Sequence, residues 1–493
     1  MSRHDCGSSH GLDCRSGYSH DPAGHSSPDC GSGYSRDPGK PGCTGHGGGE
    51  RSSPAGRSRP WPLLQGGALA VLLLASTAAA AQDLLIRNAT VHTATAQGTL
   101  QGTDVLVRNG RIAAVGTGLD AGGVPVVNAE GRPLTPTLFG GINGIGIEEV
   151  SGESATVDGR LTLGEGAHDM RVRPEFDVTL AYNPDSLLVP VARVEGIGFS
   201  LLAAGTGSGG SIIGGQGAVM RLDGGDAPAG PKLLFIDLGG RAANLTGGSR
   251  AAQWMLLDQL VDEAEGRLPP ASHMALLTPA GRATLQRHLR GALPLVVAVD
   301  RAADIRQLLR WSKRHGFKVA IRGGGEAWRV ARELAAARVP VFVDPLDNLP
   351  ANFDRVHASE RNAAVLREAG VEVGFTQAGD AAHNARKLRQ LAGNAVAHGL
   401  PWDAALAGLT RVPARTFGVD GEIGAIAPGL RADLVLWDGD PLDVASLASQ
   451  AWFDGRAIDM RSRQTELRDR YLRAEPDAAR GELPRAYPGG GDR

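Results

Sequence analysis

The chain has 493 residues, with 51 lysines and arginines against 53 aspartates and glutamates. This length exceeds one ordinary domain, although barrels of about 250 residues fold as single units. The balanced charge, with no basic stripe along the sequence, argues against a nucleic-acid partner.

The first sixty residues are rich in glycine, serine, histidine and aspartate and have almost no aliphatic side chains. Such a segment cannot build a core, so residues 1–60 are predicted to be a disordered leader or an over-extended start. All four cysteines lie here, at spacings that match no zinc pattern: Cys6, Cys14, Cys30 and Cys43. Because the remaining chain lacks cysteine, disulfides and thiol catalysis are excluded there.

Residues 61–81 read as a secretory signal peptide. Arg57 and Arg59 precede an apolar run from Leu63 to Ala75, and small residues follow up to Ala81. This order predicts cleavage near Ala81 and a periplasmic or secreted mature chain without a stable membrane span. The alternative is an uncleaved membrane anchor, which the small residues near the end of the run disfavour.

Both ends of the mature chain carry β-strand patterns. Residues 84–91 alternate, and Asn109-Gly110 separates two further alternating runs, which predicts a hairpin. Residues 423–437 and 452–458 supply a second β region. The expectation is one small β-sandwich built from residues 82–136 and 416–475, followed by a flexible tail over 476–493.

The middle of the chain alternates apolar strands with amphipathic helices. Strands are expected at 232–238, 295–299, 317–321, 339–343 and 371–376, and helices at 251–268, 302–315, 327–337, 361–368 and 384–398. Continuous apolar strands between helices are typical of a parallel sheet covered on both faces. The predicted class is therefore α/β, with a TIM-like (β/α)₈ barrel over residues 137–415.

Several segments resemble the amidohydrolase superfamily in its imidazolonepropionase-like branch. They are residues 85–89 and 109–112 near the start, and 412–415, 418–419 and 424–437 near the end. The resemblance extends over roughly residues 83–471. It implies a hydrolase of non-peptide carbon–nitrogen bonds, such as amides or cyclic amides, with a divalent metal at the barrel mouth.

The metal ligands that the resemblance implies are not matched. The family's His-x-His pair falls on Ile142 and Gly144, and neither side chain can donate a lone pair. Where later histidines and an aspartate are expected, the chain reads Val297-Ala298-Val299-Asp300, Arg322-Gly323-Gly324-Gly325-Glu326 and Gln377-Ala378-Gly379-Asp380. We therefore expect a degenerate metal site. The residues predict no cofactor, while the resemblance leaves a divalent metal open although its ligands are not matched.

Polar residues nevertheless remain at predicted strand ends. Asp380 and His383 are the catalytic candidates, and the candidates for substrate binding are Asp300, Arg301, Arg322 and Glu326. These charges also suit helix capping, with Asp300 preceding the helix at Ala302 and Glu326 opening the next one. Residues 205–210 formally match GxGxxG, but loop and strand patterns follow instead of a helix, so we interpret them as a glycine-rich loop.

Two functions stay open at this point. The first is an exported hydrolase of carbon–nitrogen bonds with a reduced site. The second is a non-catalytic binding or partner subunit of the same fold. Either takes a small molecule at the barrel mouth, and a homo-oligomer or a paralogous partner is compatible with both.

Overall fold

The computed structural model describes residues 82–161, 172–207, 209–379 and 381–473. Strands and helices alternate through the middle of this part, while β-strands gather near both of its ends, so the predicted α/β class is confirmed. The predicted leader, signal peptide and tail lie outside the described residues, and so does the candidate Asp380.

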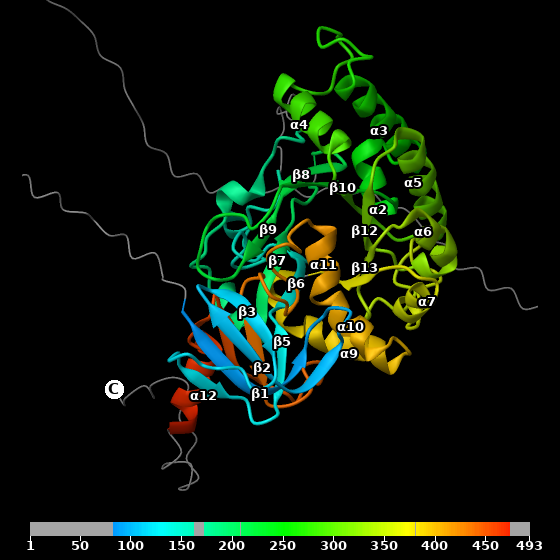
Figure 1. The fold of residues 1–493 in the computed structure, drawn as a ribbon. Coiled ribbons are helices and arrows are strands. Elements are labelled where there is room, and N and C mark those ends of the chain that lie inside the picture. The colour runs from blue at the N-terminus through cyan, green and yellow to red at the C-terminus, as the bar shows by residue number, and fades with distance from the viewer. Residues whose placement is uncertain (1–81, 162–171, 208, 380, 474–493) are drawn as a thin grey trace, which may run out of the picture. The chain divides into compact units, whose positions relative to one another are not determined.

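Strands from both ends of the mature chain join in one eight-stranded sheet, blue to cyan and orange to red in Figure 1. Strand β5 pairs antiparallel with β15, and this pairing joins the two ends. The predicted hairpin at Asn109-Gly110 is confirmed, since both residues have positive φ and Arg108 pairs with Arg111. The strands are β1 (Leu84–His92), β2 (Thr99–Arg108), β3 (Arg111–Gly116), β4 (Val126–Asn128), β5 (Pro133–Pro136), β15 (Leu434–Trp437), β16 (Ala448–Phe453) and β17 (Arg456–Ala457).

The middle of the chain supplies two further sheets. The six-stranded sheet contains β8 (Ile213–Gly217), β10 (Leu233–Asp237), β11 (Leu295–Val299), β12 (Val319–Gly323), β13 (Val341–Val343) and β14 (Val373–Phe375). From β10 to β14 all neighbours are parallel, as the sequence predicted. The three-stranded sheet contains β6 (Leu138–Asn143), β7 (Ile197–Leu202) and β9 (Val219–Arg221). The two sheets are joined through the chain itself, since Ala218 alone separates β8 from β9.

Helices follow most of the parallel strands. In Figure 1, α3 to α7 lie along one side of β10 to β13, and α9 to α11 lie between these strands and the end sheet. The helices are α1 (Leu188–Arg193), α2 (Gly240–Ala243), α3 (Arg250–Ala264), α4 (Pro279–Arg290), α5 (Ala302–His315), α6 (Ala331–Ala337), α7 (Asn362–Glu368), α8 (Ala381–Asn384), α9 (Leu388–Ala397), α10 (Trp402–Gly408), α11 (Arg411–Thr416) and α12 (Arg463–Arg473). Within the described residues, no helix combines the length and apolar character needed to cross a bilayer.

The two faces of the parallel strands pack into different cores. Val297, Val299 and Ile321 belong to the core that also contains helix residues such as Leu257 and Ile305. Alternate residues face the other way and meet an aromatic group formed by Phe139, Phe199, Phe342 and Phe417. Period-two alternation thus separates a helix-facing side from an inner side of these strands. Both sides are apolar, which explains the continuous hydrophobic runs in the sequence.

Candidate functional site

Three neighbouring strands place Asp237, Ala298 and Arg322 in one row. In the parallel register Asp237 pairs with Ala298, and Ala298 pairs with Arg322. Asp237 is the last residue of β10, Ala298 the fourth of the five residues of β11, and Arg322 the fourth of the five residues of β12. The row therefore lies at the carboxyl ends of the strands, where α/β proteins place their chemistry.

The row points to the inner side of the strands. Phe235 and Val296 belong to the inner core, and Asp237 and Ala298 follow them by two positions. Ile321 packs on the helix side, so its neighbour Arg322 has the opposite orientation. Aliphatic and aromatic side chains fill this inner side, and the polar residues begin above them.

Asp237 and Arg322 form an ion pair across the small side chain of Ala298. The distance from Arg322 Nη2 to Asp237 Oδ1 is 3.6 Å, and the two side chains are 29% and 23% exposed. Strands lie about 4.8 Å apart, so this pair spans two strand spacings, and the methyl group of Ala298 leaves the space between them open. A larger side chain at position 298 would occupy the space through which Arg322 approaches Asp237.

Thr206 adds a hydroxyl group to this pair. Its Oγ1 donates to Asp237 Oδ2 at 2.6 Å. Thr206 belongs to the glycine-rich loop, which leads into strand β8 and not into a helix, as the sequence predicted. The loop borders a small recess, which Gly205, Thr206, Gly207, Gly210 and Ser211 help to line. We call Asp237, Arg322, Thr206 and this recess the mouth site.

Sequence reasoning missed two residues of the mouth site, Asp237 and Thr206. Asp237 is the next-to-last residue of the predicted strand 232–238, so its position near a strand end could have marked it as a candidate. Nothing in the local sequence marked Thr206 as a site residue, because its hydrogen-bond partner, Asp237, lies in a distant part of the sequence. Arg322 was predicted, and the structure places it in the mouth site.

The first and last parallel strands bring apolar or neutral groups to the same end. Ile142 is 2% exposed and packs in the inner core. A Cβ atom at Gly144 would lie 3.2 Å from Glu148 Oε2, so that carboxylate already occupies the space beside the glycine. After β14, Thr376 Oγ1 is buried and has no hydrogen-bond partner among the described residues.

Two of the predicted binding residues have structural partners. Glu326 is 2% exposed and accepts hydrogen bonds from the backbone N–H groups of Ala302 (3.1 Å) and His357 (3.0 Å). The sequence predicted that Asp300 would cap the start of α5. The structure differs, because the backbone N–H of Ala302 at that start donates to Glu326 instead. Arg301 forms a hydrogen-bonded ion pair with Asp304, which raises the pKa of Arg301.

Asp300 belongs to a separate charged cluster. It accepts from Gly325 N at 3.1 Å and from Arg355 Nε at 2.9 Å, and Arg355 also pairs with Asp347. Burial raises the pKa of Asp347, while Arg355 opposes that rise. These contacts hold the loop after β13 against the loops after β11 and β12, which is a positioning role for Asp300.

His383 lies in a different hollow from the mouth site. It lines a pocket of about 350 Å³ together with residues of α1, α12 and the loop after β6. Within the part of the chain that the structure describes, no hydrogen bond or ion pair joins His383 to Asp300, Arg301, Arg322 or Glu326. The structure gives no contact between the two predicted catalytic residues, Asp380 and His383, because Asp380 lies outside the described residues.

Metal-binding geometry is not found in the described residues. No three histidine, cysteine, aspartate or glutamate side chains among them converge as they would around a metal ion.

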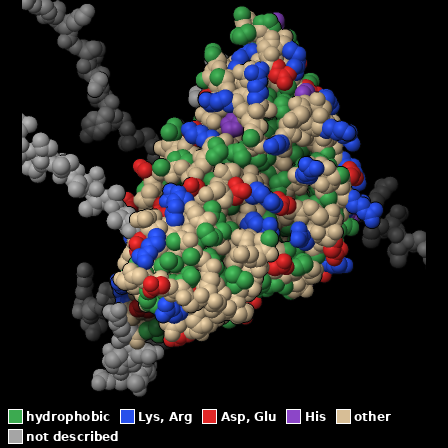
Figure 2. All heavy atoms as spheres, viewed as in Figure 1, with side chains coloured by type: hydrophobic (Ala, Val, Ile, Leu, Met, Phe, Trp, Pro, Cys, Tyr) green, Lys and Arg blue, Asp and Glu red, His purple; other side chains and the backbone are tan. Residues whose placement is uncertain are grey.

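The face drawn in Figure 2 carries Lys and Arg interspersed with Asp and Glu, without a large area of one sign.

Comparisons with known proteins found similarity to amidohydrolases. Residues 303–461 match the model of the amidohydrolase family. An amidohydrolase structure from Thermotoga maritima MSB8 has a TM-score of 0.66 and 24% identity, covering 77% of this chain and all of that one. The curated amidohydrolase tasK of Hapsidospora irregularis is 48% identical over 60 residues, which are 12% of this chain and 6% of that protein. The match thus spans a small part of this curated relative's length.

Proposed function

We propose that this chain, whose residues 303–461 match the amidohydrolase family of carbon–nitrogen hydrolases, is an exported amidohydrolase-like protein with a degenerate metal site. It acts on a small molecule at the mouth site, by the family's reaction class a non-peptide amide or cyclic amide. The observation that carries the proposal is the Asp237–Arg322 ion pair across Ala298. The guanidinium of Arg322 thus lies beside the Asp237 carboxylate at the carboxyl ends of these strands.

The strand order supports a barrel as the frame of this site. The chain passes from β8 of the six-stranded sheet through Ala218 directly into β9 of the three-stranded sheet, and the phenylalanine group draws side chains from both sheets. We propose that residues 137–415 form the (β/α)₈ barrel and that the end sheet, with residues 82–136 and 416–475, is the small sandwich domain of the family.

The residues present do not fit a divalent metal ion of the family's kind. Such a site needs several lone-pair donors around one point. Ile142 and Gly144 supply none, Ala298 ends in a methyl group, and the guanidinium of Arg322 repels a cation. No step of the proposed chemistry therefore passes through a metal.

The mouth site holds groups for proton transfer without a metal. In hydrolysis, the Asp237 carboxylate accepts a proton from a water molecule that attacks the carbonyl carbon, and it then returns the proton to the leaving nitrogen. Thr206 orients Asp237 through its hydrogen bond. Arg322 stabilises the oxyanion that develops on the carbonyl oxygen. Because Arg322 Nη2 lies 3.6 Å from Asp237 Oδ1, its guanidinium keeps N–H groups that can donate to a ligand.

A second candidate is a non-catalytic binding or partner subunit. One observation favours it: both oxygens of Asp237 face partners, Oδ1 towards Arg322 and Oδ2 towards Thr206. In that case Arg322 and the glycine-rich loop hold an anionic ligand without turnover. The protein would then serve as the binding subunit of a homo-oligomer or of a complex with a paralogous chain.

The test compares Asp237→Asn with wild type on a panel of N-acyl amino acids and cyclic amides. Removing a general base lowers turnover by about 10²–10⁴-fold, so we expect at least a hundredfold loss of kcat in the variant. A chelator should leave the wild-type rate unchanged. The matched control is Asp226→Asn, whose side chain is exposed and outside the mouth site.

The outcomes separate the alternatives. Stoichiometric zinc in active protein, with activity lost on chelation, contradicts the degenerate metal site. If wild type turns over no substrate, but carboxylate ligands stabilise it and Arg322→Gln removes that stabilisation, the binding subunit is supported. Unchanged turnover in Asp237→Asn excludes Asp237 as the base.

Export is a separate part of the proposal, and it depends on the sequence of residues 57–81. We expect amino-terminal sequencing of protein recovered from the producing cells to begin at Gln82. A chain that starts upstream of the apolar run would instead support the uncleaved anchor.

A further inference from the structure

The pocket that contains His383 lies outside the mouth site, and the two share no lining residue. Four separate segments line it: the loop after β6, helix α1, the segment from α8 to residue 386, and helix α12. Its volume of about 350 Å³ is at the lower end of the range of small-molecule sites.

The pocket lining combines aliphatic and polar side chains. Val150, Leu188 and Val191 are its aliphatic residues, here called the aliphatic wall, and His383 and Arg386 are among its polar ones. Val150 is 54% exposed, so a ligand's hydrocarbon part would cover apolar surface that water now contacts.

The charge of the lining has one sign. Arg386 is its one charged residue among the described lining residues, and none of these is an aspartate or glutamate. Neither Arg386 nor His383 has a side-chain hydrogen bond or ion pair to another residue that the structure describes. An exposed guanidinium beside an aliphatic wall complements a carboxylate that carries a short hydrocarbon chain.

The geometry points to a second binding site here, for a small aliphatic carboxylate whose head group meets Arg386 and whose chain lies on Val150, Leu188 and Val191. This site is independent of the mouth site and of the proposed function. Bound ligand would also contact Gln464 and so join α12 to α8.

The experiment titrates the mature protein with hexanoate by calorimetry. Saturable binding is expected, with acetate and 1-hexanol each much weaker, since one lacks the chain and the other the charge. Arg386→Gln should raise the Kd about tenfold, as expected for loss of a charge-assisted hydrogen bond. Val150→Asp, at an exposed position, should weaken hexanoate by placing a like charge on the aliphatic wall.

Two controls keep the result interpretable. Arg367→Gln removes an exposed arginine from α7 and should leave the Kd unchanged, and so should Asp237→Asn in the mouth site. The inference is overturned if wild type shows no saturable hexanoate binding or if 1-hexanol binds as tightly. It is also overturned if Arg386→Gln and Arg367→Gln have the same effect. An effect of Asp237→Asn alone would assign the binding to the mouth site.

Discussion

Replacing Arg221 by methionine is expected to lower the free energy of unfolding by about 3–5 kcal/mol. Arg221 ends β9, is 10% exposed, and binds Asp433 through two hydrogen bonds of 2.8 and 2.9 Å. It also pairs with Asp454 and Asp223. Asp433 directly precedes β15, so this arginine joins the inner strands to the end sheet. Without it, the Asp433 side chain, 3% exposed, loses its cationic partner.

The electrostatics explain why methionine cannot substitute for this arginine. Burial raises the pKa of Asp433, and the charge of Arg221 opposes that rise. Burial likewise disfavours the charge of Arg221, but Asp433 and its neighbours outweigh it and raise the pKa of Arg221. The pair is therefore stable only when both members are present.

Urea unfolding at neutral pH measures this effect. The control is Arg267→Met, because Arg267 is 51% exposed and pairs with the partly exposed Asp262 and Glu265. Loss of such an exposed pair costs less than about 1 kcal/mol. An Arg221→Met protein as stable as the control would show that the buried network does not hold the two sheets together.

The fold was largely predictable because its signals are local. Alternating patterns and the Asn109-Gly110 turn gave the end strands, and continuous apolar runs gave β10 to β14. The ends of the strands and helices were predicted less accurately. The strand predicted at 371–376 is Val373–Phe375, and the helix predicted at 251–268 is Arg250–Ala264. Helix ends depend on backbone hydrogen bonds that a periodic pattern does not specify.

The mouth site was less predictable because it depends on register between strands. Asp237 and Arg322 meet only because Ala298 stands between them in the same row, and the sequence does not show that row. The same limit applies to Glu326, which satisfies the start of α5 from the loop after the next strand. Local reasoning assigned that role to Asp300, the nearest carboxylate in the chain.

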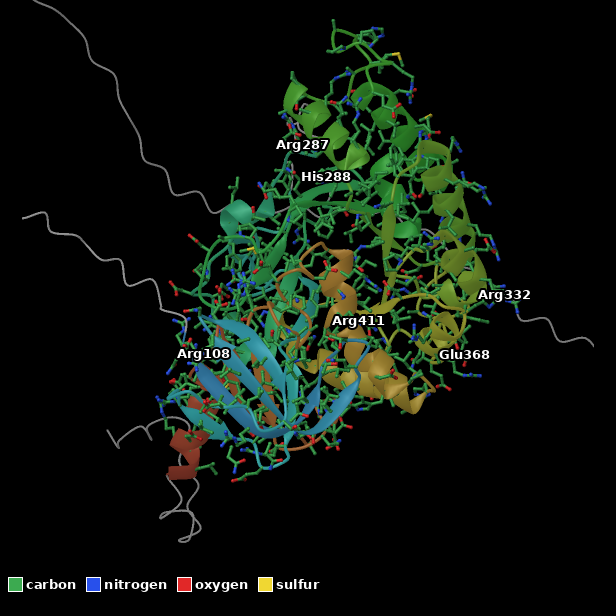
Figure 3. The ribbon with its side chains drawn as sticks, in the orientation of Figure 1. Arg108, Arg287, His288, Arg332, Glu368 and Arg411 are labelled. Atoms are coloured by element: carbon green, nitrogen blue, oxygen red, sulfur yellow. The ribbon has the colours of Figure 1, made fainter. Side chains whose placement is uncertain are left out.

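Acidification below pH 6.5 is expected to destabilise the protein through His288. This residue lies on α4 beside Arg287, in the upper part of the ribbon in Figure 3. Burial, reinforced by the charge of Arg287, lowers the pKa of His288 to about 4. Its Nε2 lies 3.1 Å from Gln216 Oε1, which fits a neutral ring donating from Nε2.

The sign follows from proton binding. The unfolded chain takes up a proton on His288 near pH 6.5, whereas the folded chain does so only near pH 4. The stability that the neutral ring contributes is therefore fully present above pH 6.5 and is lost as the pH falls to about 4. The full difference corresponds to about 3 kcal/mol at about 1.4 kcal/mol for each unit of pKa.

Unfolding free energies of wild type and His288→Gln between pH 7 and pH 4 isolate this contribution from that of other acid-sensitive groups. Glutamine keeps a donor for Gln216 but does not titrate, so the variant should lose about 3 kcal/mol less stability across this range. His273→Gln, at an exposed position, serves as the control for histidine replacement and should follow wild type. Parallel pH profiles for wild type and His288→Gln would contradict a buried neutral ring, because the proton uptake on unfolding would then come from other residues.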